Sequence, residues 1–292
     1  MTTRVAPGSD DALTSQVPGT GASSQVGAIA DEEELAERRL RARTIAGRVL
    51  VGLLFIGCWE LFSSARLIDP FYWSKPSSIV TTGWNVLWNG TLLTDIAFTS
   101  SATILGFILG ILVGAAIGLS FWWSRLYAWV AEPYLVMLNA LPKLGLAPIL
   151  VVLLGIGFGS KVALAFALTV IVTTLSAYGG VRSVDRDLEG LLYSLGASRW
   201  QVFTKVVVPW SMPWIVNSFR INIALALAGA IVGEFIASRQ GVGRMILYAG
   251  QVLDHNLVWV GVVVLGILAM VMYAAVAAIE KRLLKGFDTG TA

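Results

Sequence analysis

Residues 194–213 read SLGASRWQVFTKVVVPWSMP, a basic segment that contains two tryptophans and ends on two prolines. Long apolar runs flank it on both sides, and the chain of 292 residues is 56% apolar and only 13% charged. Soluble domains carry about 25% charged residues. The composition therefore predicts an all-α polytopic membrane protein in which this segment lies outside the lipid.

The apolar runs have the length of membrane spans, because a helix needs roughly 20 residues to cross the hydrocarbon core. They cover residues 45–64, 97–121, 127–156, 160–180, 213–236 and 257–280. The third run is too long for one plain span and contains Pro142, Gly145 and Pro148. We expect it to be one kinked crossing, or a helix with a re-entrant turn. About six transmembrane helices follow.

The ends of the chain differ in composition from these runs. Residues 1–30 are rich in Gly, Ser, Thr and Ala and are expected to be disordered. Residues 31–43, DEEELAERRLRAR, place acids four residues before arginines, which favours a solvated helix. The expected organisation is a cytoplasmic tail at 1–44, a transmembrane domain at 45–286 with a cytoplasmic segment at about 181–212, and a C-terminal tail at 287–292.

The positions of Lys and Arg predict the orientation, because cytoplasmic loops are enriched in these residues. A cytoplasmic N-terminus places most of them on the cytoplasmic side, including clusters at 38–48 and 281–285, and few outside, Lys161 among them. Both termini are therefore expected in the cytoplasm. Tryptophans near span ends, such as Trp122 and Trp123, are expected to anchor in membrane lipid at the interface.

Several kinds of site are excluded. No compact basic patch with interleaved aromatics exists for a nucleic-acid partner. The lone cysteine, Cys58, rules out an internal disulfide and a Cys-rich metal site. The stretch GIGFGSK at 155–161 lacks the Gly before Lys and the Ser or Thr after it that a phosphate loop needs. With no catalytic constellation, we expect neither an enzyme nor a cofactor.

Glycines in the second span form a stripe. Gly106, Gly110, Gly114 and Gly118 recur every four residues and so lie along one slowly drifting line of a helix. A smooth line of this kind lets another helix approach closely. The partner helix could belong to the same subunit or to another.

Polar residues inside the apolar runs are costly and need a reason. The candidates are Asn139, Lys143, Asn217, Arg220 and Glu234. Two alternatives remain open: these side chains pair with one another or with backbone groups to fix helix packing, or they face a translocation path.

The segment between the fourth and fifth spans has helical periodicity. Apolar residues recur from Leu188 to Leu195 and again from Trp200 to Val206, with Gly196 between the two sets. This pattern predicts two short amphipathic helices hinged at Gly196. Such a helix could dock into the groove of a partner protein or lie on the lipid surface.

This segment resembles the cytoplasmic motif of the inner-membrane permeases of ATP-binding-cassette (ABC) importers, E-A-A-x3-G-x9-I-x-L-P. Gly196 matches the motif glycine, and after nine residues Val206, Val207, Val208 and Pro209 stand at I-x-L-P.

The front of the motif departs from the pattern: Gly190, Leu191 and Leu192 occupy the E-A-A places, and the acid comes one residue earlier, as Glu189. Other stretches resemble the permeases of sulfonate, taurine, nitrate and thiamine-precursor importers: KPSSIV (75–80), LNALPKLGLAPILVVLLGIG (138–157), GGVRSVDRDL (179–188) and GEFIASRQGVGRMI (233–246).

The resemblance implies a type I importer permease of the bacterial inner membrane. Its partners would be cytoplasmic ABC ATPase subunits, an extracytoplasmic solute-binding protein and a second permease copy, most simply in a homodimer. The substrate would be a small organic or inorganic anion, such as a sulfonate, taurine or nitrate, or a vitamin precursor. The residues implied in coupling to the ATPase are Glu189, Gly196, Ala197, Ser198, Arg199, Trp200, Phe203 and Pro209.

Two other function classes make different predictions. An ion-coupled secondary transporter would show inverted repeats and acids or histidines in mid-span. No convincing repeat is visible, and Glu234 is the one plausible carboxylate. A membrane enzyme would need a catalytic constellation, and none is found.

Overall fold

The computed structural model describes residues 21–285, which form helices with short connections and no strand within that range. The all-α prediction is confirmed. The helices are α1 (Gly21–Ser64), α2 (Pro70–Trp73), α3 (Pro76–Trp88), α4 (Thr91–Ser120), α5 (Arg125–Ala140), α6 (Ala147–Leu154), α7 (Phe158–Arg182), α8 (Arg186–Ser194), α9 (Arg199–Val202), α10 (Val208–Asn217), α11 (Phe219–Ile236), α12 (Val242–Gln251) and α13 (His255–Leu284).

The chain divides into two units, Met1–Leu61 and Phe62–Ala292. Most of α1 belongs to the first unit, and this helix is continuous from Gly21. The charged stretch 31–43 and the first span are therefore one helix. Because this helix begins at Gly21, the disorder expected up to about residue 30 is wrong for residues 21–30. The predictions for residues 1–20 and for the C-terminal tail lie outside the described residues.

The number of spans agrees with the sequence. Among the described residues, five helices are long and apolar enough to cross a membrane, and one bent pair, α5 with the turn and helix Lys143–Leu154, would make a sixth. The fifth span begins at Phe219 instead of at Pro213, because Pro213 lies inside the separate helix α10. Helices α3 and α12 were not predicted.

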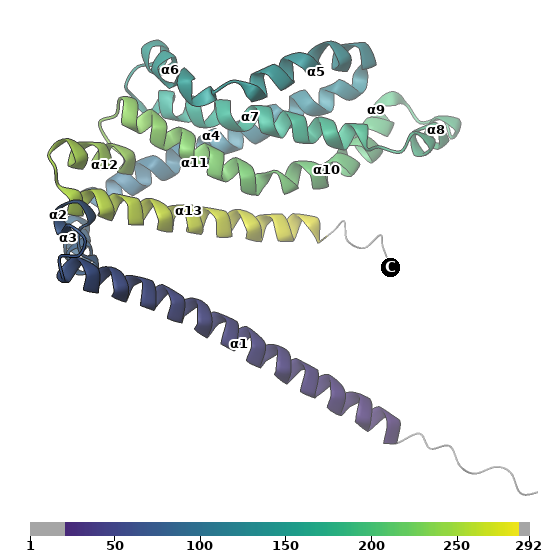
Figure 1. Ribbon diagram of the computed structural model, residues 1–292. Helices are drawn as coiled ribbons and strands as arrows, with labels where there is room; N and C mark the ends of the chain where they lie inside the picture. The colour runs from purple at the N-terminus through teal and green to yellow at the C-terminus, as the bar shows by residue number, and fades with distance from the viewer. Residues whose placement is uncertain (1–20, 286–292) are drawn as a thin grey trace, which may run out of the picture. The chain divides into compact units, whose positions relative to one another are not determined.

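Helix α7 packs along both α4 and α11 at the centre of the second unit (Figure 1). The four stripe glycines of α4, Gly106, Gly110, Gly114 and Gly118, are buried against α7. A Cβ atom on Gly110 would lie 1.8 Å from Thr169 Oγ1, far inside van der Waals contact, so only glycine fits there. The stripe thus packs within one subunit, which is one of the two arrangements that the sequence left open.

The third run is broken, as its prolines and glycines predict. The axes of α5 and of Lys143–Leu154 differ by 83°, and a 3₁₀ turn at Lys143–Leu146 lies at the break. Pro142 precedes this turn and Pro148 occupies the first turn of α6. A proline lacks the N–H that an intrahelical hydrogen bond needs. It is therefore tolerated before a helix and in its first turn, as here, but not in a helix interior.

Candidate functional site

Helices α8 and α9 meet at a tight turn around Gly196. Gly196 N–H donates to Tyr193 O and Ala197 N–H donates to Leu192 O, each at 3.0 Å, and Gly196 has a φ of +82°. This is the Schellman arrangement of a helix C-terminus, which favours glycine at its left-handed position. The predicted hinge is therefore a turn fixed by its own hydrogen bonds.

The start of α9 is fixed as well. Ser198 Oγ accepts from Gln201 N–H at 3.3 Å while Gln201 Oε1 accepts from Ser198 N–H at 2.7 Å, a reciprocal capping box. A π-helical turn, Phe203–Val207, then leads into α10, where Pro209 lies in the first turn. Because Pro209 cannot donate to Lys205 O, the regular helical ladder is interrupted at this point.

Two tryptophans at the end of α4 hold this segment in place. Trp122 Nε1 donates to Glu189 Oε1 at 3.0 Å, and Arg199 Nη2 donates to Trp123 O at 3.0 Å. The Arg199 guanidinium also lies 5.5 Å and 5.3 Å from the two indole ring centres, in cation–π range. Phe203 packs against both indole rings. Thus Glu189, the acid that stands one residue before the motif position, is hydrogen-bonded within the subunit.

The opposite side of the segment is open. Leu188 and Leu192 pack inward on the cluster of Val184, Val206 and Val207. Leu191, Leu195 and Trp200 point outward and are 56%, 74% and 61% exposed. Beside them lies a hollow of about 240 Å³, lined by Leu192, Leu195, Gly196, Ala197, Gln201 and Lys205. The segment therefore presents a rigid apolar surface with a basic edge.

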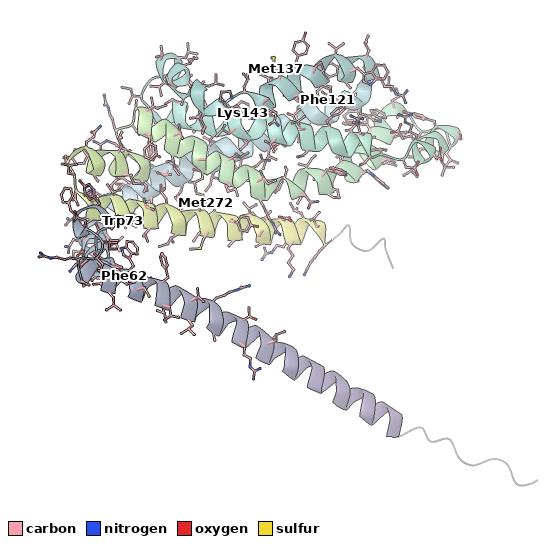
Figure 2. The ribbon with its side chains drawn as sticks, viewed as in Figure 1. Phe62, Trp73, Phe121, Met137, Lys143 and Met272 are labelled. Carbon is pink, nitrogen blue, oxygen red and sulfur yellow. The ribbon has the colours of Figure 1, made fainter. Side chains whose placement is uncertain are left out.

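The five polar residues considered for a translocation path do not form one group. Lys143 Nζ donates to Asn139 Oδ1 at 3.0 Å and to Asn139 O at 3.2 Å, at the break between α5 and α6 (Figure 2). Arg220 Nε is ion-paired with Glu280 Oε2 at 2.6 Å, which links α11 to α13. Asn217 is exposed at the end of α10. For Arg220, the pairing alternative fits the structure.

Glu234 lies in a closed polar cluster where α4, α11 and α12 meet. Its carboxylate accepts from Thr99 Oγ1 at 2.8 Å and from Gly243 N–H at 2.7 Å, and its side chain is fully buried. A Cβ on Gly241 would lie 2.3 Å from the Glu234 carboxyl carbon, so the chain approaches closely there. Glu234 is thus enclosed and holds helices together, which is the packing alternative.

The same end of the helix core contains a residue that the sequence did not identify. Lys161, expected on the outer side at the start of the fourth span, is fully buried in the first turn of α7. Its ammonium donates to Ile156 O at 2.7 Å, to Ser160 Oγ at 3.3 Å and to Ala237 O. Helix α11 packs closely on Lys161, since a Cβ on Gly233, the residue before Glu234, would lie 3.3 Å from Lys161 Cγ. The stretches 155–161 and 233–246 therefore form one polar cluster.

Comparison with known proteins agrees with this architecture. The family model described as "Binding-protein-dependent transport system inner membrane component" matches residues 106–285. The formylaminopyrimidine transport permease protein ThiX of Halalkalibacterium halodurans is 30% identical over 233 residues, covering 80% of this chain and 92% of that protein. The taurine transport system permease protein TauC of Escherichia coli is 27% identical over 261 residues, covering 86% and 95%.

A solved structure supports the fold. A chain of the MetNI methionine ABC transporter in an inward-facing conformation superposes with a TM-score of 0.58 at 17% identity, over 68% of this chain and 97% of that one. The helical core, the broken span and the capped helix pair thus occur together in a chain that matches the family over most of its membrane part. The protein belongs to the binding-protein-dependent transport system inner membrane components and is a multi-pass permease of an ABC importer.

Proposed function

We propose that this permease forms the translocation path for a small organic or inorganic anion, or for a vitamin precursor, and that a separate ATPase drives it. The names of its relatives support this substrate range: they include permeases for taurine, aliphatic sulfonates, formylaminopyrimidine and riboflavin. The GIGFGSK stretch offers no open phosphate loop, since its Lys161 is buried in the first turn of α7.

The observation that carries the coupling proposal is the rigid surface formed by α8, the Gly196 turn and α9. A docking element must transmit motion without deforming, and both helix ends here are closed by backbone and side-chain caps. Its outward face offers Leu191, Leu195 and Trp200 to a partner groove. Trp122 and Trp123 connect this surface to α4. A displacement of the coupling segment by a bound ATPase is therefore transmitted to the helices of the membrane core.

The remaining partners follow from the same scheme. A solute-binding protein delivers substrate from outside, and a second copy of the chain completes the path. ATP binding and substrate then favour two different conformations of the assembly. Apolar surface along α5, α6 and α13 contacts lipid or the second copy.

For the orientation, we propose that both termini lie in the cytoplasm. The cationic clusters at 38–48 and 281–285 support this, as does Arg199 in the coupling segment. The domain division follows: residues 1–44 form a cytoplasmic tail, residues 45–286 form the permease domain, and residues 287–292 form a C-terminal tail.

Replacing Gly196 with Val tests the coupling segment. Valine is strained at a φ of +82°, by roughly 1–3 kcal/mol, so the turn must open. We expect at least a tenfold loss of substrate-stimulated ATP hydrolysis by the purified complex, with normal membrane insertion. Gly250→Val is the matched control, because Gly250 lies in α12, outside the coupling segment, with nothing within 4 Å of a built Cβ.

Arg199→Glu tests the same segment independently, since it removes the cation–π contacts with Trp122 and Trp123 and reverses the charge of residue 199. We expect it too to lower substrate-stimulated ATP hydrolysis. Normal stimulated hydrolysis in both Gly196→Val and Arg199→Glu, with ATPase subunits still copurifying, would contradict the assignment of this segment.

A further inference from the structure

The cations inside the membrane-spanning segments differ in how their charges are balanced. Arg220 is ion-paired with Glu280, and Lys161 is buried with three oxygen acceptors around its ammonium. Among the described side chains and backbone groups, the partners of Lys143 are the carbonyl and amide oxygens of Asn139, both neutral. Within residues 21–285, no ion pair is formed by Lys143.

The surface around Lys143 is otherwise apolar. Met137, Leu141 and Leu144 are 54%, 45% and 46% exposed, and Asn139 is exposed between them. A lysine and an asparagine that faced the hydrocarbon core would be costly, since a charge near the membrane centre costs about 3 kcal/mol or more. This polar pair at the break of α5 and α6 therefore faces water or another part of the assembly.

The carboxylates in the described spans of a second copy already have partners. Glu132 is paired with Arg182, Glu280 with Arg220, and Glu234 is enclosed in its cluster. Asp95, in α4 beside that cluster, accepts from Gly241 N–H at 2.7 Å, and Glu60 has an interaction of its own. The simplest counter-charge for Lys143 is then an anion from outside the permease.

We propose that Asn139 and Lys143 form an anion-binding step in the translocation path. The ligand is a small water-soluble anion, such as a carboxylate or sulfonate, that accepts from the Lys143 ammonium and the Asn139 amide. This inference rests on the proposed transport function and narrows its substrate range to the anionic members. Because of the 83° bend, Asn139 lies in the last turn of α5 and Lys143 lies just beyond its end.

The test measures the charge preference of a cysteine placed at residue 139. The background is Cys58→Ser, which removes the lone native cysteine. Asn139→Cys is introduced into the full transporter, held in nanodiscs of phosphatidylcholine so that both faces are open and no anionic lipid is present. Reaction rates are compared for the anionic reagent MTSES and the cationic reagent MTSET, with and without Lys143→Met.

We expect both reagents to react, and we expect Lys143→Met to lower the ratio of anionic to cationic rates roughly tenfold, as a nearby unit charge in water predicts. Lys143→Arg should keep the ratio high. Gln240→Cys, in an exposed loop, gives the intrinsic ratio and should not respond to Lys143→Met. An unreactive Cys at 139, or a ratio unaffected by Lys143→Met, would overturn the proposal.

Copurification of the ATPase and stimulated ATP hydrolysis are measured on the same samples. They test the proposed function and do not depend on the cysteine result, so the two proposals fail separately.

Discussion

Replacing Lys161 with Met will lower the stability of the permease by several kcal/mol, since each buried acceptor left without its donor costs about 1–3 kcal/mol. The change removes the ammonium that binds Ile156 O, Ser160 Oγ and Ala237 O at the junction of α7 and α11. The measurement is the apparent melting temperature of purified protein in nanodiscs, with an expected drop of roughly 10 °C.

Two further variants separate the charge from the side-chain volume. Arg239→Met removes an exposed cation two residues beyond Ala237 and should change stability by no more than about 0.5 kcal/mol. The double variant Lys161→Met with Glu234→Gln should be less destabilised than the sum of the single changes, because the two side chains are neighbours in one polar cluster. Additive effects, or a Lys161→Met protein as stable as Arg239→Met, would contradict this cluster.

Gly110→Ala is expected to disrupt the contact of α4 with α7. A single methyl group there meets Thr169 Oγ1 at 1.8 Å and Thr169 Cβ at 2.7 Å, so the two helices must separate. Overpacking of this kind costs about 1–3 kcal/mol or more. We expect a fall in melting temperature of several degrees, with reduced yield of assembled protein.

Gly266→Ala is the matched control, because Gly266 lies in the long helix α13 with nothing within 4 Å of a built Cβ. Alanine favours a helix over glycine by up to about 1 kcal/mol, so this control should be neutral or slightly stabilising. If Gly110→Ala behaves in the same way, α4 and α7 do not pack through the glycine stripe.

Much of the fold could be predicted from hydropathy, because membrane spans are long and few. Helices α4, α7 and α13 fall where the apolar runs place them. Helices α3 and α12 were missed, since each is short and amphipathic and lies next to a glycine or proline stretch that indicates a loop. The fifth span was extended into α10 because its apolar composition continues through Pro213.

The candidate site was less predictable, because it depends on contacts distant in sequence. Helical periodicity predicted two short helices about Gly196, and α8 and α9 meet there. A position near span ends predicts that Trp122 and Trp123 anchor in lipid, whereas they bind Glu189 and Arg199 more than 60 residues away. The sequence predicts Lys161 on the outer side, and no local signal shows that Ile156 O and Ala237 O will bind its ammonium.

The most direct test of the account is whether the α8–α9 surface touches the ATPase. Leu195→Cys, in the Cys58→Ser background, places a photoactivatable crosslinker at the most exposed leucine of the segment. Gln240→Cys, in the loop before α12 at the other end of the helix core, serves as the matched position (Figure 1). We expect a crosslink from residue 195 to the ATPase subunit and none from residue 240. A residue 195 that crosslinks only to lipid, in a complex that retains its ATPase, would contradict it.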